Sequence, residues 1–382
     1  MKRIALVVLV LTPVWMFLIW FFWPKRKLTV AIIDKTVLTT QAQEHISFNW
    51  ILNHEKFVKN NEHLYNPSTD YFGFFPEENE KFRLKGLERF TKNQLIQLSA
   101  DADLVYLTDA YGIYRNEWIK HSDTKERSGI IYGGTSDADM QFLQLMQQNK
   151  KLIIAEFNSL GSPTSPIVRS EFEKTFGIKW LNWIGRYFAV LDTTVNTELP
   201  KWMIKNYLLQ HKHQWPFKGS GIVFVRSDDR IEILSYPADL TFQMPVIYAT
   251  AEGKNYYQLP EKIKYNYWFE INKLNKSYNH SIANFSIETN VAGTDSLLRW
   301  GIPKTFPAVS VHSNTDYRFF YFSGDFCDNP IHLFSAYFKW VEYFKWMFYN
   351  TQDPEERKSF FWKFYNPLVT KILNDYYQSR MQ

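Results

Sequence analysis

Three short apolar runs, each followed by an acidic residue, constrain the fold of this chain more than any other feature. Runs rich in valine, isoleucine and leucine are typical of strands that are buried on both faces of a parallel sheet. Segments of helical length separate them, and strands that alternate with helices indicate βαβ units. The sequence therefore predicts an α/β fold with a mostly parallel sheet. The runs are residues 28–33 before Asp34, 104–108 before Asp109, and 152–155 before Glu156.

The helices predicted between these strands have clear terminal signals. Apolar residues recur at helical spacing over residues 136–149. Another helix has Ser165 at its N-cap, Pro166 at its first helical position and Gly177 just past its end. These signals place helices on both sides of the third apolar run, as the α/β interpretation requires.

The second half of the chain is richer in β-strand patterns. Apolar runs at 221–225 and 231–234 flank a polar turn, and so do the runs at 307–311 and 317–322. Each pair predicts an antiparallel hairpin at the edge of the sheet. The last part of the chain, residues 331–382, is predicted to form a segment of two helices rich in aromatic residues.

Those two C-terminal helices are predicted from different patterns. The first, at about 333–349, has one narrow polar stripe and a wide aromatic surface. The second begins with Asp353 as N-cap and Pro354 at the first helical position, and Pro367 is expected to interrupt it. Either the helices pack on the domain, or their aromatic surface contacts a membrane or a partner.

The N-terminus predicts a membrane anchor. Residues 4–23 carry no charge, and Pro24 and three basic residues follow them. A helix of this length would cross a hydrocarbon core of about 30 Å, and the tryptophans near its end favour a bilayer interface. We therefore expect a retained transmembrane helix within residues 1–27, with the lipid bilayer as its partner. The alternative is a buried N-terminal core helix.

The predicted localisation follows from that anchor. Basic residues flank both of its ends, so the positive-inside rule does not decide the orientation. Large domains are often translocated whatever their flanking charge, which favours a single-pass protein with an extracytoplasmic body. A cleaved signal peptide is disfavoured because bulky residues, rather than a small-residue cleavage site, follow the run.

The net charge of the chain, +5, comes from 44 basic and 39 acidic residues. Residues 1–27 hold five basic residues and no acidic one, which leaves 39 of each sign in the remaining chain. A neutral body has no general attraction for phosphate backbones, so nucleic acid is not expected as a partner.

Cys327 is the single cysteine, which excludes an intrachain disulfide and any all-cysteine metal site.

The order of elements from Asp103 to Tyr187 resembles that of a known superfamily. The strand at 103–109, the helix from Ser136, the strand ending at Glu156 and the helix ending at Gly177 follow one another as in glutamine-amidotransferase-like, flavodoxin-like domains. Residues 306–309 and 319–325 are similar to the closing hairpin of that superfamily. The resemblance covers about 28–330, with insertions. It implies a flavodoxin-like domain and a membrane-anchored bacterial member that belongs to the cell envelope.

One departure from that superfamily bears on activity. An amidotransferase needs a thiolate on a tight turn after a strand, with a histidine nearby to activate it. The turn at 156–161 holds no cysteine, and Cys327 lies after the closing hairpin without a glycine elbow. The ancestral catalytic cysteine is therefore absent, and glutaminase activity is not expected.

The candidate site is placed by the rule that open parallel sheets bind ligands beyond the carboxyl ends of their strands. Asp109 and Glu156 form a candidate pair of catalytic carboxylates, because glycosidic hydrolysis uses two acids. The alternative is that such strand-end residues cap the following loops. The candidate ligand-binding residues at the same edge are Asp34, Tyr111, Tyr114, Asn158, Ser159, Arg186, Tyr187, Asp325 and Asp328.

Other motifs for chemistry are incomplete. His54-Glu55 lacks the second histidine of a zinc-protease helix, and Ser136 lacks the closing glycine of a serine-hydrolase elbow and suits a helix N-cap. His211 and His213 are two residues apart and would point to different faces of a helix. We therefore expect neither a metal nor a cofactor.

Two function classes remain open. Phenylalanine, tyrosine and tryptophan make up 18% of the chain, which is consistent with stacking on sugars or with an aromatic core. The first class is a non-catalytic ligand-binding or assembly component of the envelope, with polysaccharide or other membrane proteins as partners. The alternative is a membrane-anchored glycan hydrolase that uses a pair of carboxylates. We favour binding, because no motif with a nucleophile and its base is complete.

Overall fold

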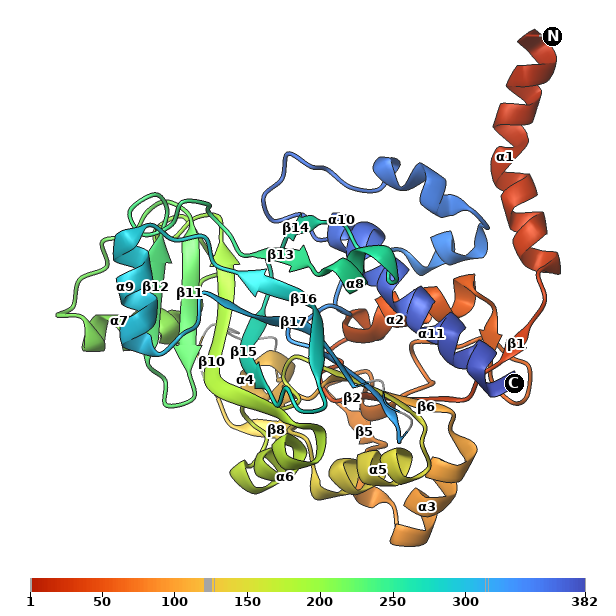
Figure 1. Cartoon of the computed structure of the whole chain (residues 1–382), viewed down its shortest axis with the longest axis horizontal. Helices are drawn as coiled ribbons and strands as arrows, with labels where there is room; N and C mark the ends of the chain where they lie inside the picture. Colours follow the sequence, from red (N-terminus) through yellow and green to blue (C-terminus); the bar gives the residue numbers. More distant parts are fainter. Residues whose placement is uncertain (1, 120–125, 127, 313, 315, 382) are drawn as a thin grey trace.

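The computed structural model describes residues 2–119, 126, 128–312, 314 and 316–381, with side chains from Leu11 onward. Within these residues, a ten-stranded sheet forms the centre of the molecule and a four-stranded sheet lies beside it (Figure 1). Two short ladders add to them, β1 (Arg26–Lys27) with β3 (Phe57–Val58) and β7 (Ile113–Tyr114) with β8 (Ile130–Tyr132).

The large sheet is mixed. The pairings from β18 through β9, β6 and β2 to β4 are parallel, and the remaining pairings are antiparallel. Its strands, in spatial order, are β14 (Lys262–Lys264), β13 (Val246–Ala249), β16 (His280–Ser286), β17 (Thr305–His312), β18 (Arg318–Phe322), β9 (Leu152–Glu156), β6 (Leu104–Asp109), β2 (Val30–Asp34), β4 (Phe72–Pro76) and β5 (Phe82–Leu84).

The prediction of a mostly parallel sheet is therefore wrong, although the three apolar runs do form parallel strands. The reason lies in the hairpin of β17 and β18, whose turn includes residues outside the described ones. β18 pairs in parallel with β9 and antiparallel with β17, so it joins the parallel part to a set of antiparallel strands. This hairpin lies inside the sheet and not at its edge.

The small sheet is antiparallel throughout. The predicted hairpin of β11 and β12 forms here, in a different sheet from the one expected. Its strands, in spatial order, are β12 (Ile231–Ser235), β11 (Gly221–Arg226), β10 (Ile178–Phe188) and β15 (Phe269–Leu274).

Two apolar layers cover the faces of the parallel strands. Val30 and Ile32 belong to a core beneath α2 (Gln43–His54) and α11 (Asn366–Met381), whereas Ala31 and Ile33 face a core beneath α5 (Asp137–Gln148). Successive strand residues point to opposite faces, so burial of both faces requires the continuous apolar runs seen in the sequence. Figure 1 shows α2 and α11 on one side of this sheet and α5 on the other.

The predicted helix signals around β9 are confirmed. Ser136 and Ser165 accept capping hydrogen bonds at the starts of α5 and α6, and Gly177 ends α6 (Pro166–Phe176) with φ of 64°. The remaining helices and helical turns are η1 (Leu87–Arg89), α3 (Lys92–Asp101), α4 (Arg115–Trp118), α7 (Lys201–Gln210), α8 (Ala251–Asn255) and α9 (Val291–Trp300).

The first helix, α1 (Lys2–Phe22), projects from the body (Figure 1). Among the residues that the structure describes, no helix is long and apolar enough to cross a membrane. The predicted transmembrane helix at 4–23, and the single-pass localisation that rested on it, are therefore wrong. The end of α1 packs on the protein instead: Trp20 is buried and donates to the Asn53 carbonyl at 3.0 Å, and Lys56 lies over the Trp20 ring.

The prediction of two regular C-terminal helices is also wrong. Residues 333–349 form two 3₁₀ segments, η2 (Leu333–Tyr337) and η3 (Val341–Met347), because Trp340 between them has φ of 67° and breaks a helix. The final helix starts at α10 (Lys358–Phe360), five residues after Asp353, and a π-helical turn, η4 (Phe361–Tyr365), precedes Pro367. Pro367 lies within the first turn of α11, where it does not interrupt the helix.

Candidate functional site

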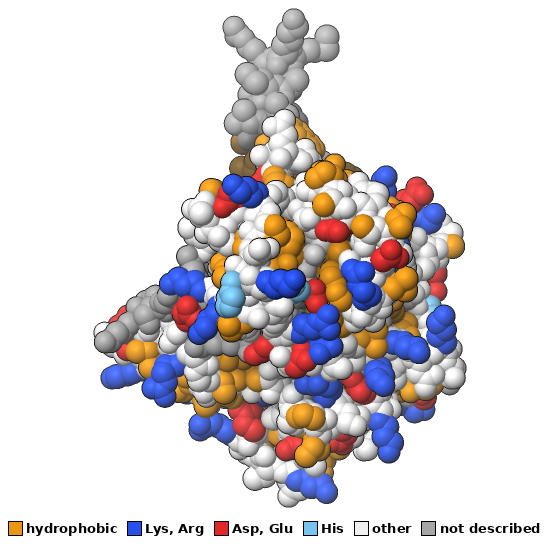
Figure 2. Space-filling model, turned by 90° about the vertical axis from the view of Figure 1, so that its left-hand side faces the viewer, with side chains coloured by type: hydrophobic (Ala, Val, Ile, Leu, Met, Phe, Trp, Pro, Cys, Tyr) orange, Lys and Arg blue, Asp and Glu red, His pale blue; other side chains and the backbone are white. Residues whose placement is uncertain are grey.

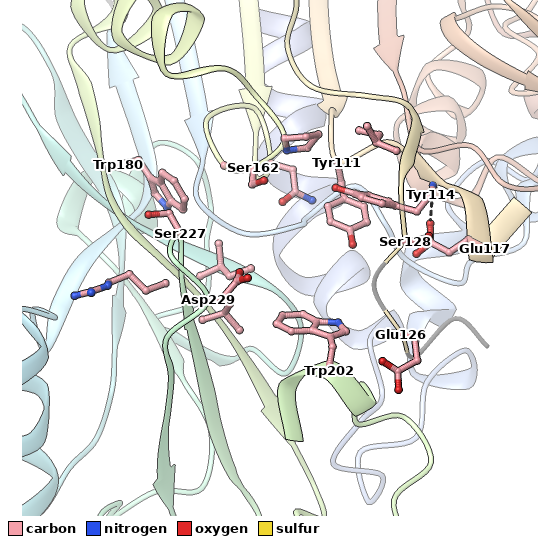
Figure 3. Close-up of a pocket in the computed structure, with 17 residues that line it drawn as sticks. Tyr111, Tyr114, Glu117, Glu126, Ser128, Ser162, Trp180, Trp202, Ser227 and Asp229 are labelled. Atoms are coloured by element: carbon pink, nitrogen blue, oxygen red, sulfur yellow. Dashed lines mark hydrogen bonds between the residues drawn. The ribbon is translucent and has the colours of Figure 1, made fainter. Parts of the chain in front are cut away.

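A cleft of about 500 Å³ opens at the carboxyl edge of β6 and β9, between the two sheets. We call it the inter-sheet cleft. Tyr111 and Tyr114 follow β6 and form one wall, and Trp180 of β10 and Trp202 of α7 lie across from them (Figure 3). The polar residues around these rings include Asn158, Ser162, Ser227 and Asp229.

The turn after β9 brings a polar side chain to this cleft. Asn158 has φ of 67°, a left-handed conformation that asparagine tolerates better than most residues. Its Nδ2 donates to Asp109 Oδ1 at 3.3 Å. The next residue, Ser159, is fully buried and donates from Oγ to the Glu156 carbonyl at 2.6 Å, so it closes the turn and does not line the cleft.

Asp109 lies beneath the cleft with an altered acidity. Its Oδ1 accepts the Tyr111 backbone N–H at 2.6 Å. Burial, followed by the charge of Asp34 on the neighbouring strand, raises the pKa of Asp109 to about 7, against hydrogen bonds that favour the charged form. The neighbouring carboxylate, Asp34, forms a hydrogen bond with the His45 ring, in which His45 Nδ1 lies 2.5 Å from Asp34 Oδ2.

Further carboxyl groups extend this acidic region. Burial, and then the charges of Asp328 and Asp109, raise the pKa of Asp325 well above its usual range. Burial, followed by the charge of Asp34, does the same for Glu44 at the start of α2. Arg357 partly offsets the negative charge, because its Nη1 lies 3.1 Å from Asp328 Oδ2. The predicted residues therefore lie close enough for their charges to interact, and they form one acidic region; they are Asp34, Asp109, Asp325 and Asp328.

Arg186 and Tyr187, the candidates from β10, take different roles. The Arg186 guanidinium lies 5.3 Å from the centre of the Tyr267 ring, and Arg357 lies 3.9 Å from the same ring. Arg186 also pairs with Glu198 at 2.7 Å. Arg186 thus reaches the rim near Asp328, whereas Tyr187 is 2% exposed and packs within the small sheet.

Glu156, the other proposed catalytic acid, lies in the interior. It is fully buried, and it accepts the Tyr106 hydroxyl at 2.7 Å and the Cys327 backbone N–H at 3.2 Å. Burial is the main cause that raises its pKa well above the usual range. Glu156 does not line the inter-sheet cleft, so the structure does not bring Asp109 and Glu156 together across it.

Sequence reasoning missed Glu270, which lies in β15 opposite Ile184, a residue of the cleft wall. Glu270 is fully buried, and burial raises its pKa to about 7 against hydrogen bonds from Asn272 and Tyr321. An acid inside the otherwise apolar strand pattern at 268–271 was the signal that could have identified it. Trp180 and Trp202 were also missed, because a single tryptophan in a strand or helix usually indicates core packing.

The described residues contain no cluster of histidine, cysteine and carboxylate side chains arranged to hold a metal ion. Within the acidic region, Asp109 accepts the Tyr111 backbone N–H and Arg357 pairs with Asp328. The arrangement can bind a polar ligand through rings and hydrogen bonds. It also offers Asp109, beside the cleft, as a carboxyl group able to exchange a proton near neutral pH.

Comparisons with known proteins show similarity in structure only. No family model matches the chain, and no curated protein matches its sequence. A ThuA-like protein from Bacteroides uniformis is 10% identical, covers 85% of this chain and 93% of its own, and has a TM-score of 0.34. A ThuA-like protein from Parabacteroides merdae is 12% identical, with coverages of 78% and 79% and a TM-score of 0.36.

A third solved structure, the carbohydrate deacetylase Agd3, is 10% identical, covers 78% of this chain and 30% of its own, and has a TM-score of 0.31. ThuA-like proteins belong to the glutamine-amidotransferase-like class, which is the class that the sequence resembles. At these identities and TM-scores, the likeness does not assign a family or an activity to the chain.

Proposed function

We propose that this protein is a ligand-binding component whose inter-sheet cleft takes a sugar or a short oligosaccharide. The observation that carries the proposal is the set of four rings, Tyr111, Tyr114, Trp180 and Trp202, around a cleft of about 500 Å³ (Figure 3). Such a volume suits a small molecule, and tyrosine and tryptophan combine a flat apolar face with a polar group. Sugars present both flat C–H faces and hydroxyl groups.

The polar groups around the rings support the same ligand class. Asn158 and Ser162 come from the turn after β9, whereas Ser227 and Asp229 come from the hairpin of the small sheet. Donors and acceptors therefore approach from both sheets, as recognition of several hydroxyl groups requires. The two proposed catalytic carboxyls both accept backbone N–H groups, which favours a binding role over a catalytic pair.

Isothermal titration calorimetry with a panel of neutral oligosaccharides tests the proposal on the full chain. We expect at least one of them to bind, and Trp202→Ala to weaken that binding at least about tenfold, because aromatic contacts often dominate such sites. Trp346→Ala is the matched control, since this tryptophan is 67% exposed and lies outside the cleft. The proposal fails if no oligosaccharide binds, or if both variants weaken binding equally.

Glycan hydrolysis is the second candidate function, favoured by one observation at the same cleft. Asp109 has a pKa raised to about 7 by burial and Asp34, and it accepts a hydrogen bond from Asn158 of the cleft. A carboxyl group with this acidity can act as an acid or a base near neutral pH. If an oligosaccharide that binds is also cleaved, and Asp109→Asn abolishes cleavage while binding remains, hydrolysis replaces simple binding as the function.

A further inference from the structure

The carboxyl group of Asp109 connects two parts of the inter-sheet cleft, although it lies beneath the cleft. Asp109 ends β6, just before the loop that carries Tyr111 and Tyr114, and it is 6% exposed. Its Oδ1 accepts the Tyr111 backbone N–H at 2.6 Å and an N–H of Asn158 Nδ2 at 3.3 Å. Tyr111 and Asn158 both line the cleft, and they come from different loops. One buried oxygen therefore holds two residues of the cleft in position.

A third hydrogen bond extends this connection along the loop after β6. The Thr36 hydroxyl forms a hydrogen bond with Asp109, and its oxygen accepts the Gly112 N–H at 2.9 Å. Gly112 has φ of 94°, a conformation that residues with a side chain rarely adopt, so the chain turns sharply here. On the two sides of this turn, the rings of Tyr111 and Tyr114 lie with their centres 4.9 Å apart. The position of the ring pair therefore depends on the hydrogen bonds around Asp109.

All three of these partners donate to Asp109. A backbone N–H and the Nδ2 group of an asparagine can only donate. The Thr36 oxygen already accepts the Gly112 N–H, and its own proton is available for the carboxyl group. Hydrogen bonds to an ionised carboxylate are shorter than those to a neutral group and about twice as strong. The contacts are therefore strong when Asp109 is charged and weaker when it is protonated.

The surroundings of Asp109 oppose that charge. The titratable groups that act on it from the neighbouring elements are acids: Asp34 of β2, Glu44 of α2, Glu156 of β9 and Asp325 after β18. The basic groups of the region bond to other carboxyls, His45 to Asp34 and Arg357 to Asp328. Burial, followed by the charge of Asp34, raises the pKa of Asp109 to about 7 against its hydrogen bonds. Both protonation states are therefore populated near neutral pH.

We propose that Asp109 is a positioning residue through which protonation controls the affinity of the inter-sheet cleft for its sugar ligand, an inference that rests on the proposed binding function and adds its regulation. The ionised carboxylate holds Tyr111 and Asn158 in the geometry that the ligand contacts. Protonation weakens both contacts, so the cleft loses this geometry and the ligand dissociates. The affinity is therefore higher above about pH 7 than below it. Because coupling between two binding events is reciprocal, the ligand favours ionised Asp109 and releases protons as it binds.

Isothermal titration calorimetry of the full chain at a series of pH values tests the proposal. The probes are the neutral hexasaccharides cellohexaose, maltohexaose and chitohexaose. For each probe that binds, the affinity should rise about tenfold from about pH 5.5 to about pH 8.5, mostly between about pH 6 and about pH 7. Buffers with different ionisation enthalpies should reveal the release of about half a proton per bound ligand near pH 6.5. An affinity that does not change with pH would overturn this proposal and leave the binding function standing, whereas no binding of any probe would refute both.

Two variants distinguish this role from a merely structural one. Asp109→Asn cannot ionise, so its affinity should stay at the value of the wild type in acid at every pH, without release of protons. Thr36→Val removes one donor to the ionised carboxylate, so the change in affinity should move to higher pH. Thermal unfolding checks that both variants fold.

Asp295→Asn is the matched control and should keep the wild-type pH profile, because Asp295 is exposed on α9. This helix lies on the side of the molecule seen in Figure 2, where acidic and basic side chains are scattered over the surface. The proposal is also refuted if Asp109→Asn keeps the wild-type profile, or if Thr36→Val leaves that profile at the same pH.

Discussion

Replacing Asp109 by asparagine should change how the stability of the protein depends on pH. In the folded protein, burial and the charge of Asp34 raise the pKa of Asp109 from 3.8 to about 7. The protonated form therefore favours folding. Its contribution is fully present below the unfolded pKa and is lost as pH rises through the folded value. The wild-type protein should thus lose stability as the pH rises from about 4 to about 7, between the unfolded and the folded pKa of Asp109.

The size of this loss follows from the shift. A shift of about three pH units, at about 1.36 kcal/mol each, corresponds to at most about 4 kcal/mol. The charge of Asp34 contributes part of this shift, so the loss belongs to the pair of carboxyl groups and not to Asp109 alone. Asp109→Asn keeps an acceptor for the Tyr111 N–H and cannot ionise. Above about pH 8 the variant should be more stable than the wild type by about 2–4 kcal/mol.

Urea denaturation at a series of pH values measures this difference. Asp295→Asn is the control, because Asp295 is exposed on α9 and its loss should leave the curve unchanged. The free energy of unfolding of Asp109→Asn should approach that of the wild type in acid and exceed it in alkali. Parallel curves for the variant and the wild type would show that Asp109 is ionised at neutral pH, and would refute its assignment as a proton-exchanging group.

Two further predictions concern stability. Lys35 is 1% exposed and pairs with the fully buried Asp139, so Lys35→Met should lower the free energy of unfolding by about 3–5 kcal/mol. The double variant Lys35→Met with Asp139→Asn should lose less than the sum of the two single changes, and additive losses in urea denaturation would contradict this pairing. Gly177→Ala should lower the melting temperature more than Gly301→Ala. Both glycines have a positive φ, but only at Gly177 would the new Cβ meet a side chain, that of Tyr278 at 2.5 Å. Equal losses of melting temperature would show that backbone conformation alone determines the effect.

Elements with local signals were predictable from the sequence. Ser165, Pro166 and Gly177 bound α6 as their capping chemistry predicts, and the apolar runs before Asp34, Asp109 and Glu156 form neighbouring parallel strands. These features depend on a few residues that are close in sequence. Tyr111, Tyr114 and Asn158, which the sequence places at the carboxyl edge of the strands, line a cleft there, and their binding role stays a prediction.

Features that depend on distant contacts were not predictable in this way. The position of β18 between β17 and β9 is set by packing over more than a hundred residues, which no local pattern reports. Residues 333–349 have a helical apolar pattern, but aromatic residues are weaker helix formers and Trp340 adopts a left-handed conformation. The interior position of Glu156 follows from its contact with Tyr106, which points to the core opposite α5.

The place of β18 in the large sheet also governs the order in which the molecule can assemble. During synthesis, β2, β6 and β9 emerge early, yet the edge of β9 has no neighbour until residues 318–322 have been made. Until then, this edge presents free backbone groups next to an apolar surface, which is a template for aggregation. Folding of the central sheet should therefore be slow and largely post-translational, and a chain truncated before β18 should require a chaperone to remain dispersed.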